Sequence, residues 1–275
     1  MKTFLFLNRL PWIARVPAKW IVLLGTVGAV CYPYPRRLVT HWQRIQNPDA
    51  LINPESPALE PLIAEVKQEL TPDLTPPQVL KKIESFVYKK VPYEWDWNTW
   101  GVADYFPTVE EALSQGKEDC DGRAIVAASI MRYFGYDARL VTDFAHLWVT
   151  TSEGDVMNPG KTKAAVATGD GFQLQPGAFR QLVQPLAYGV SVFPLARELI
   201  VIGVLWWLLL GRGVSKVRAM GSLLFLVNGL FLLRLGSDWR HPQNTAQALA
   251  AANLLVGVVL PWFGSRAKLV TESPM

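Results

Sequence analysis

The sequence has very little of what most metal centres and disulfide frameworks are built from. Among 275 residues there are only two cysteines and three histidines. Cys31 lies in an apolar run and Cys120 in a polar segment, so we expect no disulfide between them. No Cys-x-x-Cys pair occurs, and the histidines are far apart, at His41, His146 and His241. We therefore expect no zinc site, no other metal and no cofactor.

Excess positive charge is also missing from the middle of the chain. Residues 36–186 contain 15 Lys/Arg and 20 Asp/Glu, whereas the two flanks contain 12 and 3. The net charge of +4 therefore comes from segments beside apolar runs. That arrangement is typical of membrane topology signals and unlike a nucleic-acid-binding surface. We expect the lipid bilayer as a partner and no nucleic acid.

Four apolar runs predict membrane-spanning helices. The first, Trp20–Tyr34, is short, and we expect its helix to begin near Val16. A cleaved signal peptide is the alternative, although no small-x-small cleavage site follows the run. The other three runs are long enough, or nearly so, to span a bilayer: Val190–Leu210, Ala219–Leu235 and Ala246–Phe263. Arg197 and Glu198 near the start of the second run indicate either a headgroup position or an interfacial segment.

Charge placement predicts the topology of an integral membrane protein. Four spans with both termini in the cytoplasm put most flanking positive charge inside and the middle domain, residues 36–186, outside. The inner positive residues are Lys2, Arg9, Arg15, Lys19, Arg212, Lys216, Arg218, Arg266 and Lys268, and the short outer loop has Arg240 with Arg234 at its edge.

These features divide the chain into an N-terminal segment (1–35), a middle domain (36–186, with a core at about 78–160) and a C-terminal membrane region (187–275). Within the middle domain, the proline-rich stretch Arg36–Pro77 is expected to be a tether that contains one helix. Lys161–Pro185 has no clear period and is expected to close the domain. The predicted helices are Leu59–Leu70, Pro77–Lys90 and Thr108–Leu113.

The stretch Gly116–Ala127 places a single cysteine where a glycine-containing loop becomes a helix. Asp119 can cap this helix, and Gly135 can end it. A thiol at a helix N-terminus is favoured as the nucleophilic thiolate. Acidic neighbours such as Glu118 and Asp121 act against this, because they raise the pKa of the thiol. We expect the helix, Arg123 and an imidazolium partner to prevail.

A histidine and an asparagine follow the cysteine at the spacing of a β-hairpin. Strands are predicted at Ala138–Thr142 and His146–Thr151, then a turn at Ser152–Asp155 and a returning strand to Asn158. This hairpin puts Asn158 opposite or diagonal to His146, while alternation points Asp155 to the other face. We predict Cys120 as nucleophile, His146 as general base and acid, and Asn158 as the group that orients the imidazole.

Four motifs together resemble the transglutaminase-like superfamily of cysteine enzymes: Gly116-x-x-Asp119-Cys120-Asp121-Gly122-x-Ala124, Gly135-Tyr136, His146-x-Trp148-Val149 and Asn158-Pro159. The resemblance covers roughly Val91 to Gly160. Many members carry Asp where this chain has Asn158, and either side chain offers an acceptor oxygen, so we expect Asn158→Asp to be tolerated. The resemblance implies a papain-like α+β domain that forms a thioester from an amide or peptide substrate and passes the acyl group to water or an amine.

The segment Val91–Phe106 is dense in aromatic residues: Tyr93, Trp95, Trp97, Trp100, Tyr105 and Phe106. These rings either pack on the domain or form one wall of a substrate cleft, with an indole N–H directed at an oxyanion. The second possibility also supports a different function, namely a catalytically silent module that binds a peptide or partner in the aromatic cleft.

Overall fold

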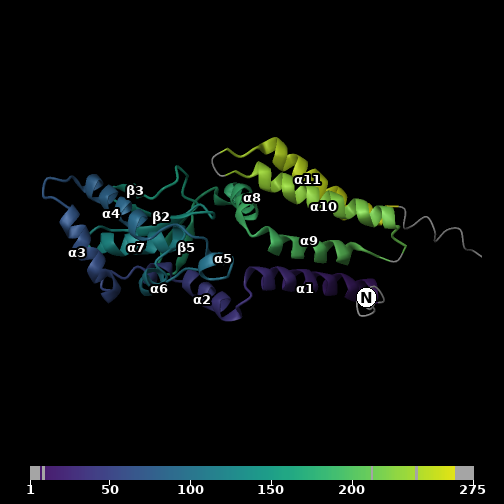
Figure 1. Ribbon diagram of the computed structural model, residues 1–275, viewed down its shortest axis with the longest axis horizontal. Coiled ribbons are helices and arrows are strands. Elements are labelled where there is room, and N and C mark those ends of the chain that lie inside the picture. Colours follow the sequence, from purple (N-terminus) through teal and green to yellow (C-terminus); the bar gives the residue numbers. More distant parts are fainter. Residues whose placement is uncertain (1–6, 8–9, 212, 239–240, 264–275) are drawn as a thin grey trace, which may run out of the picture. The chain divides into compact units, whose positions relative to one another are not determined.

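The computed structural model describes residues 7, 10–211, 213–238 and 241–263. The chain divides into two compact units, one of Tyr32–Pro185 and one of Met1–Cys31 with Leu186–Met275 (Figure 1). We describe each unit by itself. Several residues used to predict the topology lie outside the described residues: Lys2, Arg9, Arg212, Arg240, Arg266 and Lys268.

An antiparallel sheet of five strands, in the order β3-β2-β1-β4-β5, forms one layer of the Tyr32–Pro185 unit. The first three strands follow the predicted hairpins closely, because a short turn at Ser152 and Glu153 joins β2 to β3. Val149 is paired with Val156 across β2 and β3. The strands are β1 Arg139–Thr142, β2 Leu147–Thr151, β3 Gly154–Val156, β4 Ala165–Thr168 and β5 Gly171–Leu174.

The hairpin β4–β5 lies in the segment that was expected only to close the domain. Val141 in β1 is paired with Val166 in β4, so this segment extends the sheet on the side opposite β2. Ala165 and Ala167 are buried while Val166 and Thr168 are half-buried, an alternation that small alanine side chains make hard to recognise in the sequence. Gly171 adopts a positive φ of 108° at the start of β5, a conformation that favours glycine.

Helices pack on this sheet, and α7 (Cys120–Tyr133) is the most enclosed of them. This helix packs against both α4 (Pro76–Lys90) and the strands β1 and β2. The predicted helix at Thr108–Leu113 is present as α6 (Val109–Gln115), and Thr108 and Glu111 form a capping box at its start. Ten α7 residues are buried: Asp121, Gly122, Ala124, Ile125, Val126, Ala127, Ala128, Ser129, Ile130 and Met131.

The proline-rich stretch before α4 is part of the domain, so its prediction as a tether is wrong. Prolines open each of its helices, where a missing N–H costs nothing. The stretch forms α2 (Pro35–Ile45), 3-10 helices at Pro48–Leu51 and Pro57–Leu59, and α3 (Glu60–Glu69). Its apolar side chains complete the main core, which includes Leu51, Ile52, Leu59, Ile63 and Val66.

The other unit contains the apolar helices. Those that are each long and apolar enough to cross a bilayer are α1 (Trp12–Cys31), α10 (Lys216–Gly236) and α11 (Asn244–Val259, extended by a 3-10 turn to Trp262). The predicted run Val190–Leu210 is instead split between α8 (Val183–Val192) and α9 (Leu195–Leu209), which meet at 110°. Counting that bent pair as one span gives up to four, which agrees with an integral membrane protein.

The break before α9 gives Glu198, the acidic residue of the charged pair in this apolar run, an arginine partner in α10. Proline at 194 cannot continue a helix, so the carbonyl groups at the end of α8 need other donors. Arg234 of α10 donates to the carbonyls of Val190 (2.9 Å) and Phe193 (2.8 Å) and forms an ion pair with Glu198. The pair therefore satisfies buried backbone at the bend.

Glycines allow α10 and α11 to approach closely. A Cβ on Gly229 would lie 2.8 Å from Leu254, and a Cβ on Gly257 would lie 2.7 Å from Leu226. Small residues at a helix interface have this effect in membrane proteins. Asn228 and Asn253 are also hydrogen-bonded to each other at 2.9 Å.

Candidate active site

Cys120 is the first residue of α7, as predicted, and Asp119 is its N-cap. The Asp119 carboxylate accepts a hydrogen bond from the backbone N–H of Asp121 at 2.9 Å. Gly122 lies against the buried side chain of Glu118, and a Cβ at this position would come within 2.5 Å of Glu118 Cγ. Glycine in the motif therefore makes room for a carboxyl group beneath the first turn.

The Cys120 thiol lies against the start of β2. The backbone N–H of Leu147 lies close enough to the thiol to lower its pKa, and His146 is the residue directly before Leu147. The first turn of α7 therefore lies against the residue that follows the predicted base. On its other side, Cys120 Sγ lies 3.5 Å from Asp121 Oδ1.

The surroundings of Cys120 raise the pKa of its thiol well above the ordinary value. Burial is the main cause, followed by the charges of Asp121 and Asp119, while the Leu147 N–H acts in the opposite direction. The expectation that the helix N-terminus holds the thiol as a thiolate is therefore wrong for this structure. A helix dipole contributes less than the desolvation of a buried anion next to two carboxyl groups.

His146 is held by a tight turn that begins at Asp143. Asp143 Oδ1 accepts hydrogen bonds from the backbone N–H groups of Ala145 (3.0 Å) and His146 (2.9 Å). The same oxygen lies 3.8 Å from Nδ1 of the His146 ring. Asp143 is itself buried. The sequence analysis missed this residue, although an Asp three residues before a histidine is a recognisable Asx-turn signal.

Asn158 closes a turn of its own. Its Oδ1 accepts from the backbone N–H groups of Gly160 and Lys161, both at 2.8 Å. Its Nδ2 donates to Asp155 Oδ2 at 2.9 Å and to the Lys161 carbonyl at 3.2 Å. An amide side chain has two acceptor and two donor positions, so this turn occupies all four.

The contact between Asn158 and Asp155 corrects the prediction that the two side chains point to opposite faces. Strand β3 ends at Val156, and Met157 adopts a positive φ of 64°. This left-handed residue reverses the chain, so alternation along a strand no longer applies. Asn158→Asp would place a second carboxylate against Asp155 and remove the donor, so the turn should not tolerate it.

Five carboxyl groups form a cluster at the start of α7, next to Cys120: Asp96, Asp104, Glu118, Asp119 and Asp121. Burial raises the pKa of Glu118 to about 8 and that of Asp119 to about 7. Burial also raises the pKa of Asp96 and of Asp121 well above the ordinary value, with neighbouring carboxylates adding to the effect. At neutral pH this cluster therefore retains protons that ordinary carboxyl groups would have lost.

Parts of this cluster have the geometry of an oxygen-rich cation site. Asp96, Asp104 and Asp121 bring one carboxylate oxygen each within 4.8 Å of one another, as do Asp96, Glu118 and Asp119. Carboxylate oxygens suit hard cations such as Ca²⁺ or Mg²⁺ and are not the usual ligands of structural zinc. These residues could hold such an ion; the expectation of no metal stays a prediction.

The aromatic segment contains both buried and partly exposed rings. Trp100 is buried and its indole N–H is directed at Glu118, 3.1 Å from Oε1 and 3.3 Å from Oε2. This tryptophan therefore packs in the domain. Trp95 and Trp97 are stacked on each other at 4.7 Å with an interplanar angle of 14°, and both are only partly buried.

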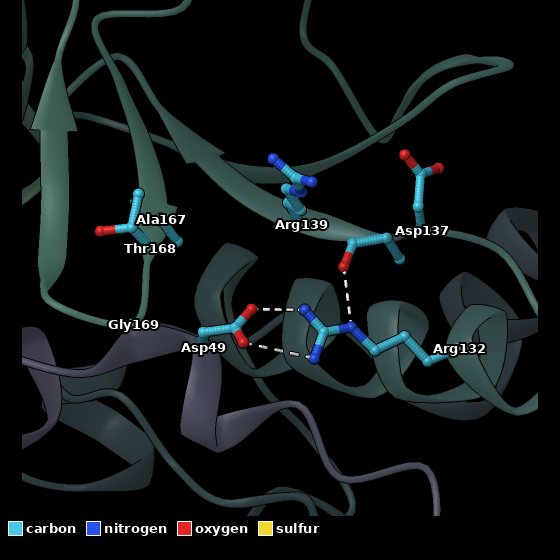
Figure 2. Close-up of a pocket in the computed structure, with 8 residues that line it drawn as sticks. Asp49, Arg132, Asp137, Arg139, Ala167, Thr168 and Gly169 are labelled. Carbon is cyan, nitrogen blue, oxygen red and sulfur yellow. Dashed lines mark hydrogen bonds and ion pairs between the residues drawn. The ribbon is translucent and has the colours of Figure 1, made fainter.

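A polar hollow of about 450 Å³ lies at the other end of α7, away from Cys120 (Figure 2). There the two Nη atoms of Arg132 face Asp49 and its Nε donates to the Ala138 carbonyl at 2.9 Å. The residues that line it are Asp49, Arg132, Asp137, Ala138, Arg139, Ala167, Thr168 and Gly169.

Comparison with known proteins supports the resemblance seen in the sequence. Residues 62–167 match the model of the family described as the transglutaminase-like superfamily. The match runs from α3 to β4 and contains both Cys120 and His146, but it covers less than half of the 275 residues. No curated protein matches the chain. The chain thus contains a transglutaminase-like domain of helices packed on an antiparallel sheet.

Gly122→Ala should destabilise the domain by about 2 kcal/mol, because the new methyl group has no room beside buried Glu118. At an open helical position the same change would instead stabilise by up to about 1 kcal/mol. Pulse proteolysis of the full chain in detergent, at increasing urea, measures the unfolding free energy. Gly169→Ala is the control, because a Cβ there meets no atom within 4 Å. Equal effects of the two substitutions would contradict the prediction.

The unfolding free energy should fall as the pH rises from about 4.5 to 8. Glu118, with a pKa of about 8, and Asp119, with a pKa of about 7, stay protonated in the folded domain at pH values where the unfolded chain has lost these protons. The folded state binds more protons, so rising pH favours unfolding. Glu118→Gln should flatten the slope by about 1.4 kcal/mol per pH unit. The exposed residue Glu55 provides the control, Glu55→Gln; an unchanged slope in Glu118→Gln would refute the assignment.

Proposed function

We propose that the Tyr32–Pro185 unit is a cysteine enzyme domain in which Cys120 attacks the carbonyl carbon of an amide or peptide substrate. The observation that carries this proposal is the position of Cys120 at the first residue of α7, with the backbone N–H of Leu147, the residue after His146, close enough to the thiol to lower its pKa. The match of residues 62–167 to the transglutaminase-like superfamily supports the same chemistry. A protein or peptide is the expected substrate.

The raised pKa of the thiol determines how the reaction begins. Cys120 is protonated at rest, so His146 removes the proton from sulfur as the C–S bond forms. The resulting imidazolium then donates that proton to the leaving amine when the tetrahedral intermediate collapses to a thioester. Water or a second amine attacks the thioester, with His146 again as base, and the thiol is regenerated. Hydrolysis and acyl transfer share every step up to the thioester.

The start of α7 offers a donor for the oxyanion. Cys120 is the first helical residue, so its backbone N–H has no acceptor within the helix. An N–H in that position is favourably directed toward a negative oxygen, because it lies at the positive end of the helix dipole. We assign this N–H to the oxyanion of the tetrahedral intermediate.

Two residues compete for the role of orienting the His146 imidazole. Asn158 is the residue at the position that carries Asp in many transglutaminase-like proteins, and it acts in this role if the 157–161 turn opens. Asp143 lies 3.8 Å from His146 Nδ1 in the structure and carries a negative charge that can stabilise an imidazolium.

The alternative to catalysis, a silent peptide-binding module, draws support from the raised thiol pKa and from the stacked pair Trp95 and Trp97.

A generic acyl donor tests the proposal without knowledge of the substrate. p-Nitrophenyl acetate should release p-nitrophenol and leave an acetyl group on Cys120, identified by mass spectrometry of the full chain. Cys120→Ala should abolish the adduct, and His146→Ala should slow its formation by about 100-fold or more. A wild-type chain that forms no acyl adduct on Cys120 would support the silent binding module instead.

The same assay separates the two candidate orienting residues. Asp143→Asn keeps the shape of the turn but removes the charge, so it should slow acylation more than Asn158→Ala if Asp143 stabilises the imidazolium. The reverse order would assign the role to Asn158. Loss of orientation should cost less than loss of His146, since the base itself remains.

We also propose that the unit containing Cys120 lies outside the cytoplasm and that both termini lie inside. The proposal rests on the positive residues in the N-terminal turns of two apolar helices, Arg15 and Lys19 in α1 and Lys216 and Arg218 in α10, because positive charge at the ends of spans stays in the cytoplasm. A bent pair α8–α9 that crosses the bilayer as one span gives the even number of spans that this topology needs.

Reporter fusions test this topology. A fusion after Gln175 should be active with a periplasmic or secreted enzyme reporter and inactive with a reporter that works only in the cytoplasm. A fusion at the C-terminus should show the opposite pattern. Cytoplasmic activity at both positions would show that the domain does not cross the membrane, and external activity at both would show that α8–α9 does not span it.

A further inference from the structure

We propose that Arg123 is a carboxylate-binding residue of the acyl-donor site and selects substrates with a carboxylate next to the attacked amide. This inference rests on the proposed role of Cys120. Arg123 and Cys120 are three residues apart in α7, a spacing that places side chains on the same helix face. The side chain of Arg123 is only partly buried. A bound group could therefore contact both residues.

Two tyrosines fix the plane of the guanidinium group. The Arg123 Cζ lies 5.1 Å from the ring centre of Tyr88 and 5.1 Å from that of Tyr93. Both tyrosines are 43% exposed, so their rings form a wall at the surface. The Arg123 Nε donates to the Val91 carbonyl at 2.8 Å, which anchors one edge of the group. Cation–π contacts and this hydrogen bond hold the side chain in one orientation.

The remaining edge of the guanidinium carries the two Nη atoms. Within the described part of the chain, no residue accepts a hydrogen bond from them and no carboxylate forms an ion pair with Arg123. The nearby acid Glu94 is instead engaged by Lys117 at 3.4 Å and by Asn98 at 2.7 Å. Two parallel N–H donors on a fixed plane match the two oxygens of a carboxylate.

Arg132, farther along the same helix, shows what a structural arginine looks like in this fold. Its Nε also donates to a backbone carbonyl, that of Ala138, at 2.9 Å. Its two Nη atoms, however, face the carboxylate of Asp49 (Figure 2). Arg123 has the same kind of backbone anchor but no carboxylate partner among the residues that the structure describes. It lies in the half of α7 that begins with Cys120, the candidate nucleophile. The substrate would supply the missing partner.

The local electrostatics favour such a partner. Burial lowers the pKa of Arg123, although the surrounding tyrosines and Asp119 act in the opposite direction. The charged guanidinium is therefore short of stabilisation in the absence of a ligand, and a bound carboxylate would restore it. Elsewhere around Cys120 the carboxyl cluster disfavours anions, so only a carboxylate that reaches Arg123 gains from this site.

Paired thiol reagents test the inference directly on the full chain. N-chloroacetyl-glycine carries a carboxylate a few bonds from its reactive carbon, and N-chloroacetyl-glycinamide is its neutral counterpart. The ratio of their alkylation rates at Cys120 should fall about 5-fold in Arg123→Gln. It should be unchanged in Arg132→Gln and fall less in Arg123→Lys, which keeps the charge but loses the flat fork. A second pair, the N-chloroacetyl α-amides of Glu and Gln, distinguishes a side-chain carboxylate from a terminal one by which pair shows the larger fall.

Every result of this experiment either supports or overturns the carboxylate site at Arg123. An equal loss for both reagents in Arg123→Gln would mean a purely structural role and would overturn the proposal, as would an unchanged ratio. If Arg123→Gln fails to fold, the smaller fall in Arg123→Lys becomes the deciding result. No alkylation of wild-type Cys120 by either reagent would overturn both this site and the proposed nucleophile. A shifted ratio without an acyl adduct from p-nitrophenyl acetate would keep the carboxylate site and reject catalysis.

Discussion

The burial of α7 is the constraint on which the candidate site depends. Almost every residue from Asp121 to Met131 is enclosed by the sheet and the neighbouring helices, so the first turn of the helix cannot shift to suit the thiol. The groups around Cys120 must therefore come from other segments: the start of β2 places the Leu147 N–H near the thiol, and the preceding loop supplies Asp119. A rigid first turn of this kind fixes catalytic geometry at low entropic cost.

The same enclosure has an electrostatic consequence. A motif rich in acids next to a nucleophilic thiol looks unfavourable in the sequence, because charged neighbours oppose a thiolate. In the structure these acids are buried, and their raised pKa values mean that several of them are neutral near pH 7. These acids therefore oppose formation of the Cys120 thiolate less than their number suggests. The main obstacle to the thiolate is instead the burial of the thiol. In the proposed reaction, the proton of Cys120 therefore leaves as the C–S bond forms and not before it.

Local patterns in the sequence predicted the helix and hairpin around Cys120 and His146 well, and they failed where long-range packing decides. The N-cap of α7, the capping box of α6 and the hairpin β2–β3 follow from short-range hydrogen bonding, so they could be predicted. Leu51 and Leu59 are core residues because they pack against residues far along the chain. The many prolines around them instead favoured the prediction of a tether. The φ of Met157 was likewise invisible, because nothing in its residue type favours a left-handed conformation.

The paired glycines of α10 and α11 have a mechanical meaning. Leu254 of α11 packs against Gly229 of α10, and Leu226 of α10 packs against Gly257 of α11. Each large side chain therefore lies opposite a glycine of the other helix. Sliding one helix by one turn, about 5.4 Å, would bring Leu226 and Leu254 to the same level and remove this fit. The hairpin can tilt or move as a whole but cannot change its register. Any motion within this unit is therefore expected to occur outside the contact between α10 and α11.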